Sequence, residues 1–123
     1  MKKSLKVLIV EDDESSLMLL VEFFKLYDFD VYVCNDGVSA IEFIELNRDT
    51  DLILMDLRMP TLNGIEASKR ILEVKPEMII IAQSAYVKSD TKKLALDIGI
   101  NAFFTKPLVL VDLMDYIENK FDL

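Results

Sequence analysis

Residues 5–13 read LKVLIVEDD, a largely apolar run of six residues that ends in three consecutive acids. A short run of this kind, bounded by polar residues, is typical of a strand buried in a sheet. After it, apolar residues recur at the i, i+3, i+4 and i+7 spacing of a helix with one buried face, at Leu17, Leu20, Val21 and Phe24. The stretch therefore predicts a strand over 5–10, an acidic turn and a helix over 14–27.

The same alternation continues along the rest of the chain. Short β-branched or apolar runs predict further strands over 30–34, 51–55, 78–82 and 102–105. Amphipathic segments, bounded by turn and cap residues such as Gly99, predict helices over 37–47, 65–74, 88–98 and 108–121. Apolar strands joined by helices favour a parallel sheet that is covered by helices on both faces. We therefore expect an α/β fold made of five consecutive strand–helix units.

Length and composition limit the possible functions. The chain has 123 residues and a net charge of −8, so we expect one domain over 1–123, with a core at about 5–120 and no output domain. The excess of acid repels nucleic acid phosphates, which argues against direct nucleic acid binding. No apolar run approaches the ~18 residues of a membrane span, and the N-terminus is unlike a signal peptide. We expect a cytoplasmic protein without membrane insertion.

The sequence contains one cysteine, Cys34, and no histidine. Without histidine, Ser-His-Asp and Cys-His nucleophile systems and most zinc sites are excluded. A lone cysteine cannot form an internal disulfide, and the apolar surroundings of Cys34 predict a small core residue. Any histidine chemistry must therefore come from a partner.

Polar residues at the ends of the predicted strands form the candidate site. Ligands of open α/β sheets bind outside the carboxyl ends of the strands, where the strand order reverses. We expect the groups found there to meet at one edge of the sheet, and they are Glu11, Asp12, Asp13, Asp56, Gln83, Ser84 and Lys106.

The chemistry of these groups points to phosphoryl transfer. Clustered carboxylates without histidine or cysteine select Mg²⁺, Ca²⁺ or Mn²⁺ over zinc, and such a divalent ion relieves their mutual repulsion. A carboxylate such as Asp56 can act as a nucleophile and form an aspartyl-phosphate. Lys106 and Ser84 would then neutralise or hydrogen-bond the phosphoryl oxygens.

Each of these residues also has an ordinary structural interpretation. The acids after the first strand could be charges that favour a helix N-terminus, and Asp13, nearest the helix, fits this interpretation. Lys106 alone could be a surface lysine before a proline, and Ser84 alone a loop residue. Their joint placement at the ends of different strands is what favours a functional site.

Four segments carry a family resemblance, and they are LIVEDD at 8–13, LMDLRMP at 54–60, AQSA at 82–85 and TKP at 105–107. Over about 5–120 the sequence resembles the receiver domains of two-component response regulators. The run at 79–90 looks more like receivers fused to hybrid histidine kinases. The resemblance implies a flavodoxin-like (βα)5 doubly wound three-layer sandwich, with a five-stranded parallel sheet in the order 2-1-3-4-5.

The resemblance also implies roles for individual residues. Asp56 would be the phosphorylation site, assisted by Lys106 and Ser84. Mg²⁺ would be held by Glu11, Asp12, Asp56 and the backbone carbonyl of Arg58. In the family, a cis peptide bond joins the residue that matches Lys106 to the proline after it.

The same resemblance implies the partners and the kind of activity. The phosphoryl donor would be a histidine kinase or a histidine phosphotransfer domain. The protein would be a signalling phosphoacceptor rather than an enzyme, capable only of Mg²⁺-dependent self-phosphorylation and autodephosphorylation. We expect a monomer or weak dimer.

Departures from the commonest family pattern leave some roles open. Phe103 stands where many members carry Tyr, so it either turns inward on activation by burial alone or packs statically against the last helix. Arg58 and Tyr86 flank the phosphorylation pocket and are predicted to restrict attacking water. Lys88 and Lys92 lie in a basic patch that is either a solvated helix face or part of a switching partner surface.

Three other functions compete with this interpretation. A haloacid-dehalogenase-type phosphatase would need a second Asp where Arg58 stands. A flavodoxin-like cofactor binder would need a Ser/Thr/Gly-rich phosphate loop in place of the acids after the first strand. A degenerate receiver, used only for interactions, would lack some of the five residues that the family needs for phosphorylation. All five are present, and they are Glu11, Asp12, Asp56, Ser84 and Lys106.

Overall fold

A computed structural model describes residues 4–59, 62–85 and 88–123. Its strands are β1 (Lys6–Val10), β2 (Asp30–Cys34), β3 (Leu52–Asp56), β4 (Ile79–Ser84) and β5 (Ala102–Thr105). Its helices are α1 (Glu14–Leu26), α2 (Gly37–Leu46), α3 (Gly64–Val74), α4 (Ser89–Asp97) and α5 (Leu110–Phe121). Within these described ranges, none of the helices has the length and apolar character needed to cross a membrane.

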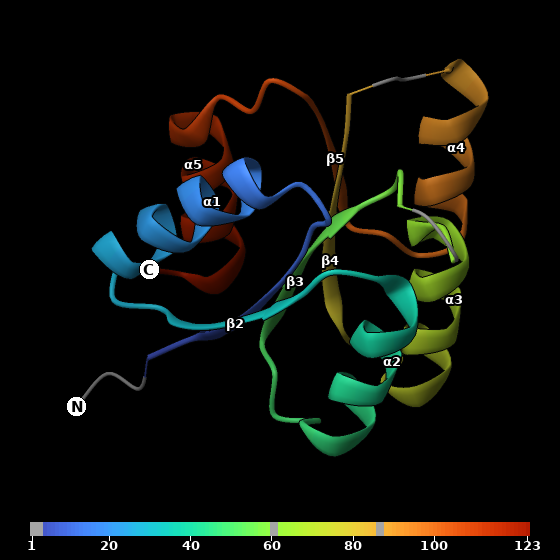
Figure 1. Cartoon of the computed structure of the whole chain (residues 1–123), viewed down its shortest axis with the longest axis horizontal. Helices are drawn as coiled ribbons and strands as arrows, with labels where there is room; N and C mark the ends of the chain where they lie inside the picture. Colours follow the sequence, from blue (N-terminus) through green and yellow to red (C-terminus); the bar gives the residue numbers. More distant parts are fainter. Residues whose placement is uncertain (1–3, 60–61, 86–87) are drawn as a thin grey trace.

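The strands form one sheet in the order β2-β1-β3-β4-β5, and every neighbouring pair is parallel. This order confirms the predicted doubly wound fold. Helices α1 and α5 cover one face of the sheet, while α2, α3 and α4 cover the other (Figure 1). Because β1, β3 and β4 lie inside the sheet with helices on both sides, nearly all their residues are buried.

Side chains of the strands alternate between two core layers. Ile9 and Leu54 face α1 and α5, and Leu8 and Ile53 face α2, α3 and α4. The apolar faces predicted for the first and last helices are confirmed, since their residues either are buried in the first layer or pack against it: Leu17, Leu20, Val21, Phe24, Leu110, Leu113, Met114, Ile117 and Phe121. Each fully buried side chain of this size stabilises the fold by about 1.5–3 kcal/mol.

Three element boundaries differ from the sequence prediction at or near the site. β3 runs one residue later than predicted, so Asp56 is its last residue. β4 continues to Ser84, so Gln83 and Ser84 end the strand instead of following it. The reason is that β4 pairs with β3 as far as Gln83 and with β5 as far as Ser84. The Leu57 N–H donates to the Gln83 carbonyl at 3.0 Å, and the Lys106 N–H donates to the Ser84 carbonyl at 2.9 Å. α5 begins later than expected, at Leu110.

Short polar side chains fix the starts of three helices. Asp13 accepts a hydrogen bond from the Ser16 N–H at 2.9 Å, and Asp36 and Asn63 cap α2 and α3 in the same way. The hydrogen bonds from Ser16 lower the pKa of the Asp13 carboxyl. Asp13 is therefore committed to the helix start, as the sequence predicted.

The prediction that Cys34 is a core residue is only partly correct. Cys34 packs against the core layer beneath α2, α3 and α4, but it remains partly exposed because β2 is an edge strand. Burial, helped by the charges of Asp36 and Glu42, raises the pKa of the Cys34 thiol to about 11.

This raised pKa predicts a poorly reactive thiol. The thiolate is the reactive form, so a pKa of about 11 instead of 9.0 lowers the alkylation rate at pH 8 by about 100-fold relative to the unfolded chain. The rate should rise about tenfold per pH unit up to about pH 11. Iodoacetamide labelling followed by intact mass measures it, with the urea-unfolded chain as control. Equal rates in folded and unfolded protein would contradict the expectation.

Candidate functional site

The ends of four strands bring the candidate side chains to one edge of the sheet. Val10 pairs with Met55 across β1 and β3, so Glu11 lies next to Asp56. Asp56 pairs with Gln83 on β4. Lys106 follows Thr105, the last residue of β5. Residues far apart in the sequence therefore meet because parallel strands all end at the same edge.

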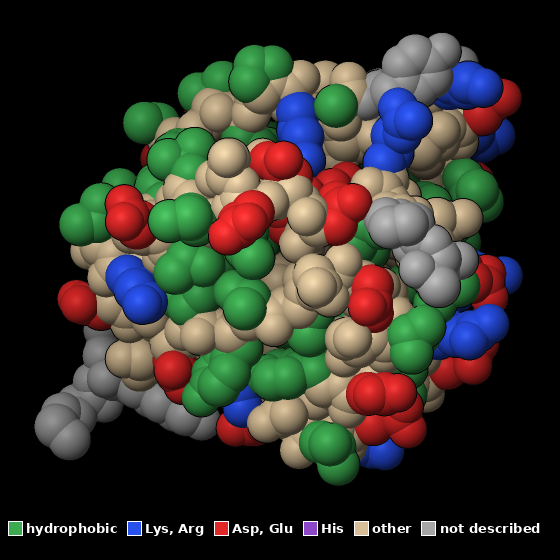
Figure 2. Space-filling model, in the orientation of Figure 1, with side chains coloured by type: hydrophobic (Ala, Val, Ile, Leu, Met, Phe, Trp, Pro, Cys, Tyr) green, Lys and Arg blue, Asp and Glu red, His purple; other side chains and the backbone are tan. Residues whose placement is uncertain are grey.

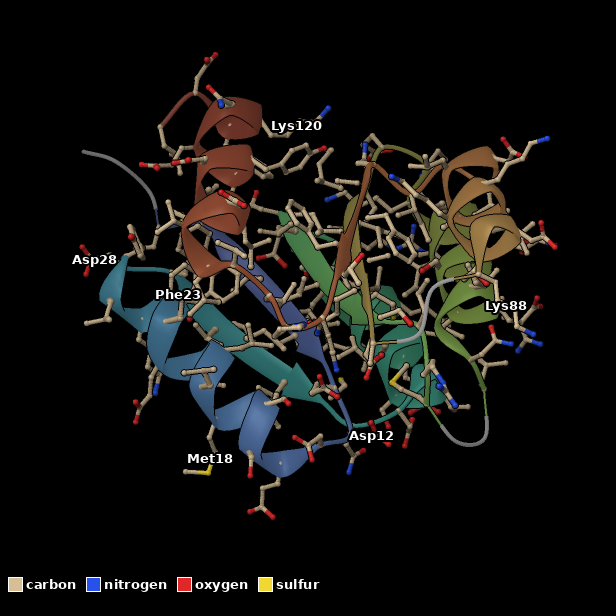
Figure 3. All side chains as sticks on the ribbon, turned by 90° about the horizontal axis from the view of Figure 1, so that it is seen from above. Asp12, Met18, Phe23, Asp28, Lys88 and Lys120 are labelled. Carbon is tan, nitrogen blue, oxygen red and sulfur yellow. The ribbon has the colours of Figure 1, made fainter. Side chains whose placement is uncertain are left out.

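Three carboxylates gather at this edge. One oxygen each from Glu11, Asp12 and Asp56 lies within 4.8 Å of the others. Glu11 and Asp56 are only 1% and 3% exposed, whereas Asp12 is exposed where β1 leads into α1 (Figure 3). Figure 2 shows several acidic side chains close together near the top of the view, with others spread over the rest of that face. Oxygen ligands at this spacing, open to water on one side, suit a hard divalent cation such as Mg²⁺.

Lys106 bridges the two buried carboxylates. Its Nζ lies 2.7 Å from Glu11 Oε1 and 3.3 Å from Asp56 Oδ2, and the peptide bond to Pro107 is cis. Burial acts to lower the pKa of the Lys106 ammonium, but the hydrogen bond to Glu11 and the charges of Asp56 and Glu11 outweigh it and raise this pKa. The lysine therefore stays charged and offsets part of the repulsion between the acids.

One positive charge does not fully compensate the cluster. Burial, together with the side chain of Asp56, raises the pKa of the Glu11 carboxyl, and the hydrogen bond from Lys106 opposes this only in part. Because burial disfavours the charged form of the Glu11 carboxyl, a second cation nearby would stabilise that form. The residues present thus fit a divalent metal.

The Asp56 carboxylate is held in a defined orientation. The Arg58 N–H donates to Oδ1 at 3.0 Å, and Lys106 donates to Oδ2. The start of α3 packs directly on the Asp56 backbone, because an ideal Cβ at Gly64 would lie 2.4 Å from the Asp56 carbonyl oxygen and 2.7 Å from Leu57 Cα. In the sequence, Gly64 lies in the loop just before the helix predicted over 65–74. Its role in positioning Asp56 depends on the approach of a helix that sequence spacing does not reveal.

The strand residues predicted to switch have different surroundings. Ser84 is fully buried at the end of β4. Phe103 packs against the core layer beneath α2, α3 and α4, while Phe104 faces α5, with its ring centroid 6.1 Å from that of Tyr116. The alternative in which Phe103 packs against the last helix is therefore wrong, because neighbouring strand residues point to opposite faces.

The other predicted residues lie at the margin of the site or outside the described residues. Arg58, Lys88 and Lys92 are exposed, and Lys88 is the residue before α4 (Figure 3). The prediction for Tyr86 falls outside the residues that the structure describes.

Gln83 is an unexpected feature of the site. Its side chain is fully buried, and neither its amide nitrogen nor its amide oxygen has a hydrogen-bond partner among the described residues. Buried polar groups are nearly always paired, so an unpaired amide next to Asp56 calls for an explanation.

Replacing Gln83 with leucine, which has a similar size, should stabilise the protein. Removing two unpaired polar atoms raises the free energy of unfolding by about 1–2 kcal/mol. Urea denaturation measures this change, and Asn101→Leu is a contrasting control, because Asn101 Oδ1 accepts the Ile80 N–H at 2.9 Å and its loss should destabilise. A clear loss of stability in Gln83→Leu would mean that the amide is paired in solution.

The doubly wound sheet, with an acidic cluster and a lysine at its carboxyl edge, defines an α/β domain built to bind at its strand ends. The family model of the response regulator receiver domain matches residues 7–118. The chain therefore belongs to the response regulator receiver domain family.

Curated relatives include both transcription factors and hybrid kinases. The chain is 36% identical over 113 residues to transcription factor SKN7 of Saccharomyces cerevisiae, covering 92% of this chain and 18% of that protein. It is 35% identical over 115 residues to hybrid signal transduction histidine kinase A of Dictyostelium discoideum, covering 89% of this chain and 5% of that protein. The chain thus spans less than a fifth of the length of either relative.

Solved structures agree with the family assignment. A chain in the co-crystal structure of the S. cerevisiae histidine phosphotransfer protein Ypd1 with the receiver domain of Ssk1 matches with a TM-score of 0.85 and 29% identity, covering 96% of this chain and 89% of that one. The receiver domain of the Pseudomonas aeruginosa sensor histidine kinase PA1611, with magnesium coordinated in its active-site cleft, matches with a TM-score of 0.86 and 26% identity, covering 95% of this chain and 97% of that one. The chain is a receiver domain of two-component and phosphorelay signalling, and such domains are signalling phosphoacceptors.

Proposed function

We propose that Asp56 is the phosphoacceptor of this receiver domain and takes its phosphoryl group from a phosphohistidine of a histidine kinase or phosphotransfer domain. The observation that supports this most is the contact of Lys106 Nζ with two buried carboxylates, at 2.7 Å from Glu11 and 3.3 Å from Asp56. A carboxylate oxygen of Asp56 attacks phosphorus, the P–N bond breaks, and its electron pair stays on the donor imidazole. The sequence has no histidine, so the donor lies outside it.

The acidic cluster would hold Mg²⁺ through Glu11, Asp12, Asp56 and the backbone carbonyl of Arg58. When bound, Mg²⁺ neutralises the charge that develops on the phosphoryl oxygens. The raised pKa of Glu11 supports a cation here, since a buried carboxyl gains most from one. Lys106 stabilises a second phosphoryl oxygen, and the Ser84 hydroxyl donates to a third.

Phosphorylation would then shift the partner surface formed by α4, β5 and α5. Ser84 and Phe103 lie on the neighbouring strands β4 and β5, so movement of the serine toward a phosphoryl group can be passed to the aromatic side chain. Phe103 lacks a hydroxyl, so its inward state rests on burial alone. The exposed Lys88 and Lys92 lie on this surface and would contact the partner.

Phosphotransfer from a phosphorylated histidine phosphotransfer protein in Mg²⁺ tests the phosphoacceptor role. Intact mass should show one added phosphoryl group on the parent and none on Asp56→Asn. Asp51→Asn is the control and should be phosphorylated like the parent. Asp51 directly precedes the first residue of β3, at the end of the strand away from Asp56. Phosphorylation that persists in Asp56→Asn would overturn the proposal.

The lifetime of the aspartyl-phosphate should depend on two large residues that the sequence predicts at the phosphorylation pocket. Arg58 is exposed two residues after Asp56, and Tyr86 follows Ser84 by two, so both are proposed to hinder the attacking water. The double variant Arg58→Asn, Tyr86→Ala should lose its phosphoryl group several-fold faster after the donor is removed. An unchanged decay rate by intact mass would refute this role.

A further inference from the structure

The side chain of Lys106 crosses one strand of the sheet to reach the acidic cluster. Lys106 directly follows β5, whereas its Nζ contacts Asp56 at the end of β3 and Glu11 beyond β1. The sheet order places β4 between β3 and β5. Neighbouring strands lie about 4.8 Å apart, so the lysine must pass over the end of β4.

Gln83 lies beside this path. It pairs with Asp56 on β3 and with Phe104 on β5, so it is the β4 residue between Asp56 and the strand that leads to the lysine. Ile81 and Leu54, two residues before Gln83 and Asp56, both belong to the core layer that faces α1 and α5. Because side chains two apart in a strand point to the same face, the side chains of Gln83 and Asp56 are neighbours on that face.

The Gln83 amide has no hydrogen-bond partner in this arrangement of the site. The residue is 0% exposed, and neither amide atom is paired within residues 4–59, 62–85 and 88–123. A buried donor and acceptor without partners raise the free energy of the state that leaves them so. A rearrangement that brings a partner to the amide is favoured to the same extent.

Lys106 is the donor that the proposed phosphorylation would move. Its ammonium donates to Glu11 Oε1 at 2.7 Å, and Glu11 is one of the carboxylates assigned to the metal. A divalent cation on Glu11 repels the ammonium, while a phosphoryl group on Asp56 attracts it. The ammonium carries several N–H donors, so a lysine that leaves Glu11 needs an acceptor besides the phosphoryl group. The amide oxygen of Gln83 is an acceptor along its path.

Building on the proposed function, we propose that Gln83 positions Lys106 for phosphoryl transfer. Its amide oxygen accepts a hydrogen bond from the ammonium once the lysine has turned from Glu11 to the phosphoryl group. Gln83 acts through Lys106 and is therefore a positioning residue. Because the amide gains this partner only in the phosphorylated form, Gln83 raises the affinity of the site for a phosphoryl group.

Beryllofluoride with Mg²⁺ stands in for the phosphoryl group in a structural test. In a crystal structure of the parent bound to both, Lys106 Nζ should lie within about 3.2 Å of Gln83 Oε1. A Gln83 amide that is still unpaired there, or that hydrogen-bonds only water, would overturn the proposal.

A variant separates positioning from a purely structural role. In ¹⁹F NMR titrations with Mg²⁺, Gln83→Leu should bind beryllofluoride at least about tenfold more weakly than the parent, the loss of one hydrogen bond to a charged group. Its melting temperature without ligands should nevertheless be unchanged or higher. Ser68→Ala is the control and should bind like the parent. It also removes a buried hydroxyl without a partner among the described residues, but from α3, on the other face of the sheet.

The outcomes of this titration are distinct. Parental affinity in folded Gln83→Leu would refute the positioning role and leave the phosphoacceptor role of Asp56 intact. Absence of binding by the parent itself would refute the proposed function, and the positioning role with it.

Discussion

Replacing Lys106 with methionine is expected to slow phosphorylation of Asp56 by about 100-fold or more, because a donor aimed at the developing charge is lost. Methionine keeps the apolar stem of the lysine and removes only its ammonium. Without that charge, the buried Glu11 and Asp56 repel each other with nothing between them, so the free energy of unfolding in EDTA should fall by about 2 kcal/mol. Mg²⁺ should restore most of this loss, since the same carboxylates are the ligands in the proposed metal site.

Two measurements check this expectation. The phosphorylation rate is followed by intact mass with a small-molecule or protein donor, and stability by urea denaturation with EDTA or Mg²⁺. Lys75→Met is a matched control, because Lys75 donates to the backbone carbonyls of Arg48 and Thr50, away from the acidic cluster. A phosphorylation rate in Lys106→Met within a few-fold of the parent would show that the ammonium does not act on the transferred group.

Substituting Gly64 with alanine is expected to damage both stability and function. The added Cβ would lie 2.4 Å from the Asp56 carbonyl oxygen and 2.7 Å from Leu57 Cα, and neither backbone atom can move as a flexible side chain would. Such overpacking costs about 3 kcal/mol, and the shift of α3 or of the β3 end displaces the Asp56 carboxylate. We expect a lower free energy of unfolding and slower phosphorylation of whatever protein remains folded.

Ser68→Ala in the same helix is the control for this change. Ser68 is fully buried and its hydroxyl has no partner among the described residues, so its removal should change stability by less than about 1 kcal/mol. Denaturation curves and phosphorylation rates of both variants decide the matter. A Gly64→Ala protein with parental stability and rate would mean that α3 does not press on the Asp56 backbone in solution.

Much of the fold could be predicted from residue patterns. Buried runs such as 5–10 and the spaced apolar residues after them identify parallel strands and their covering helices, because nothing else buries that surface. The rule that parallel strands end at one edge was enough to predict that Glu11, Asp56 and Lys106 would meet, as they do. Asp13 could be assigned to the helix start by its position alone.

Other features depend on distances that the sequence does not encode locally. The end of β4 at Ser84 follows from pairing with both neighbouring strands, which no single run reveals. The face on which Phe103 lies depends on the register of β5, and the partial exposure of Cys34 follows from the edge position of β2. Gly64 matters because α3 packs closely on the Asp56 backbone at this position, and Gln83 matters because its buried amide has no hydrogen-bond partner among the described residues. Both features arise only when the chain is packed.

The most direct test of the central claim is the binding of beryllofluoride, which mimics a phosphoryl group on a carboxylate. ¹⁹F NMR is recorded for the parent and Asp56→Asn, each with Mg²⁺ and with EDTA. We expect bound fluoride signals only for the parent in Mg²⁺, because the complex needs both the Asp56 carboxylate and the metal at the acidic cluster. Equal binding by Asp56→Asn, or binding by the parent that ignores Mg²⁺, would contradict the assignment of Asp56 as a metal-dependent phosphoacceptor.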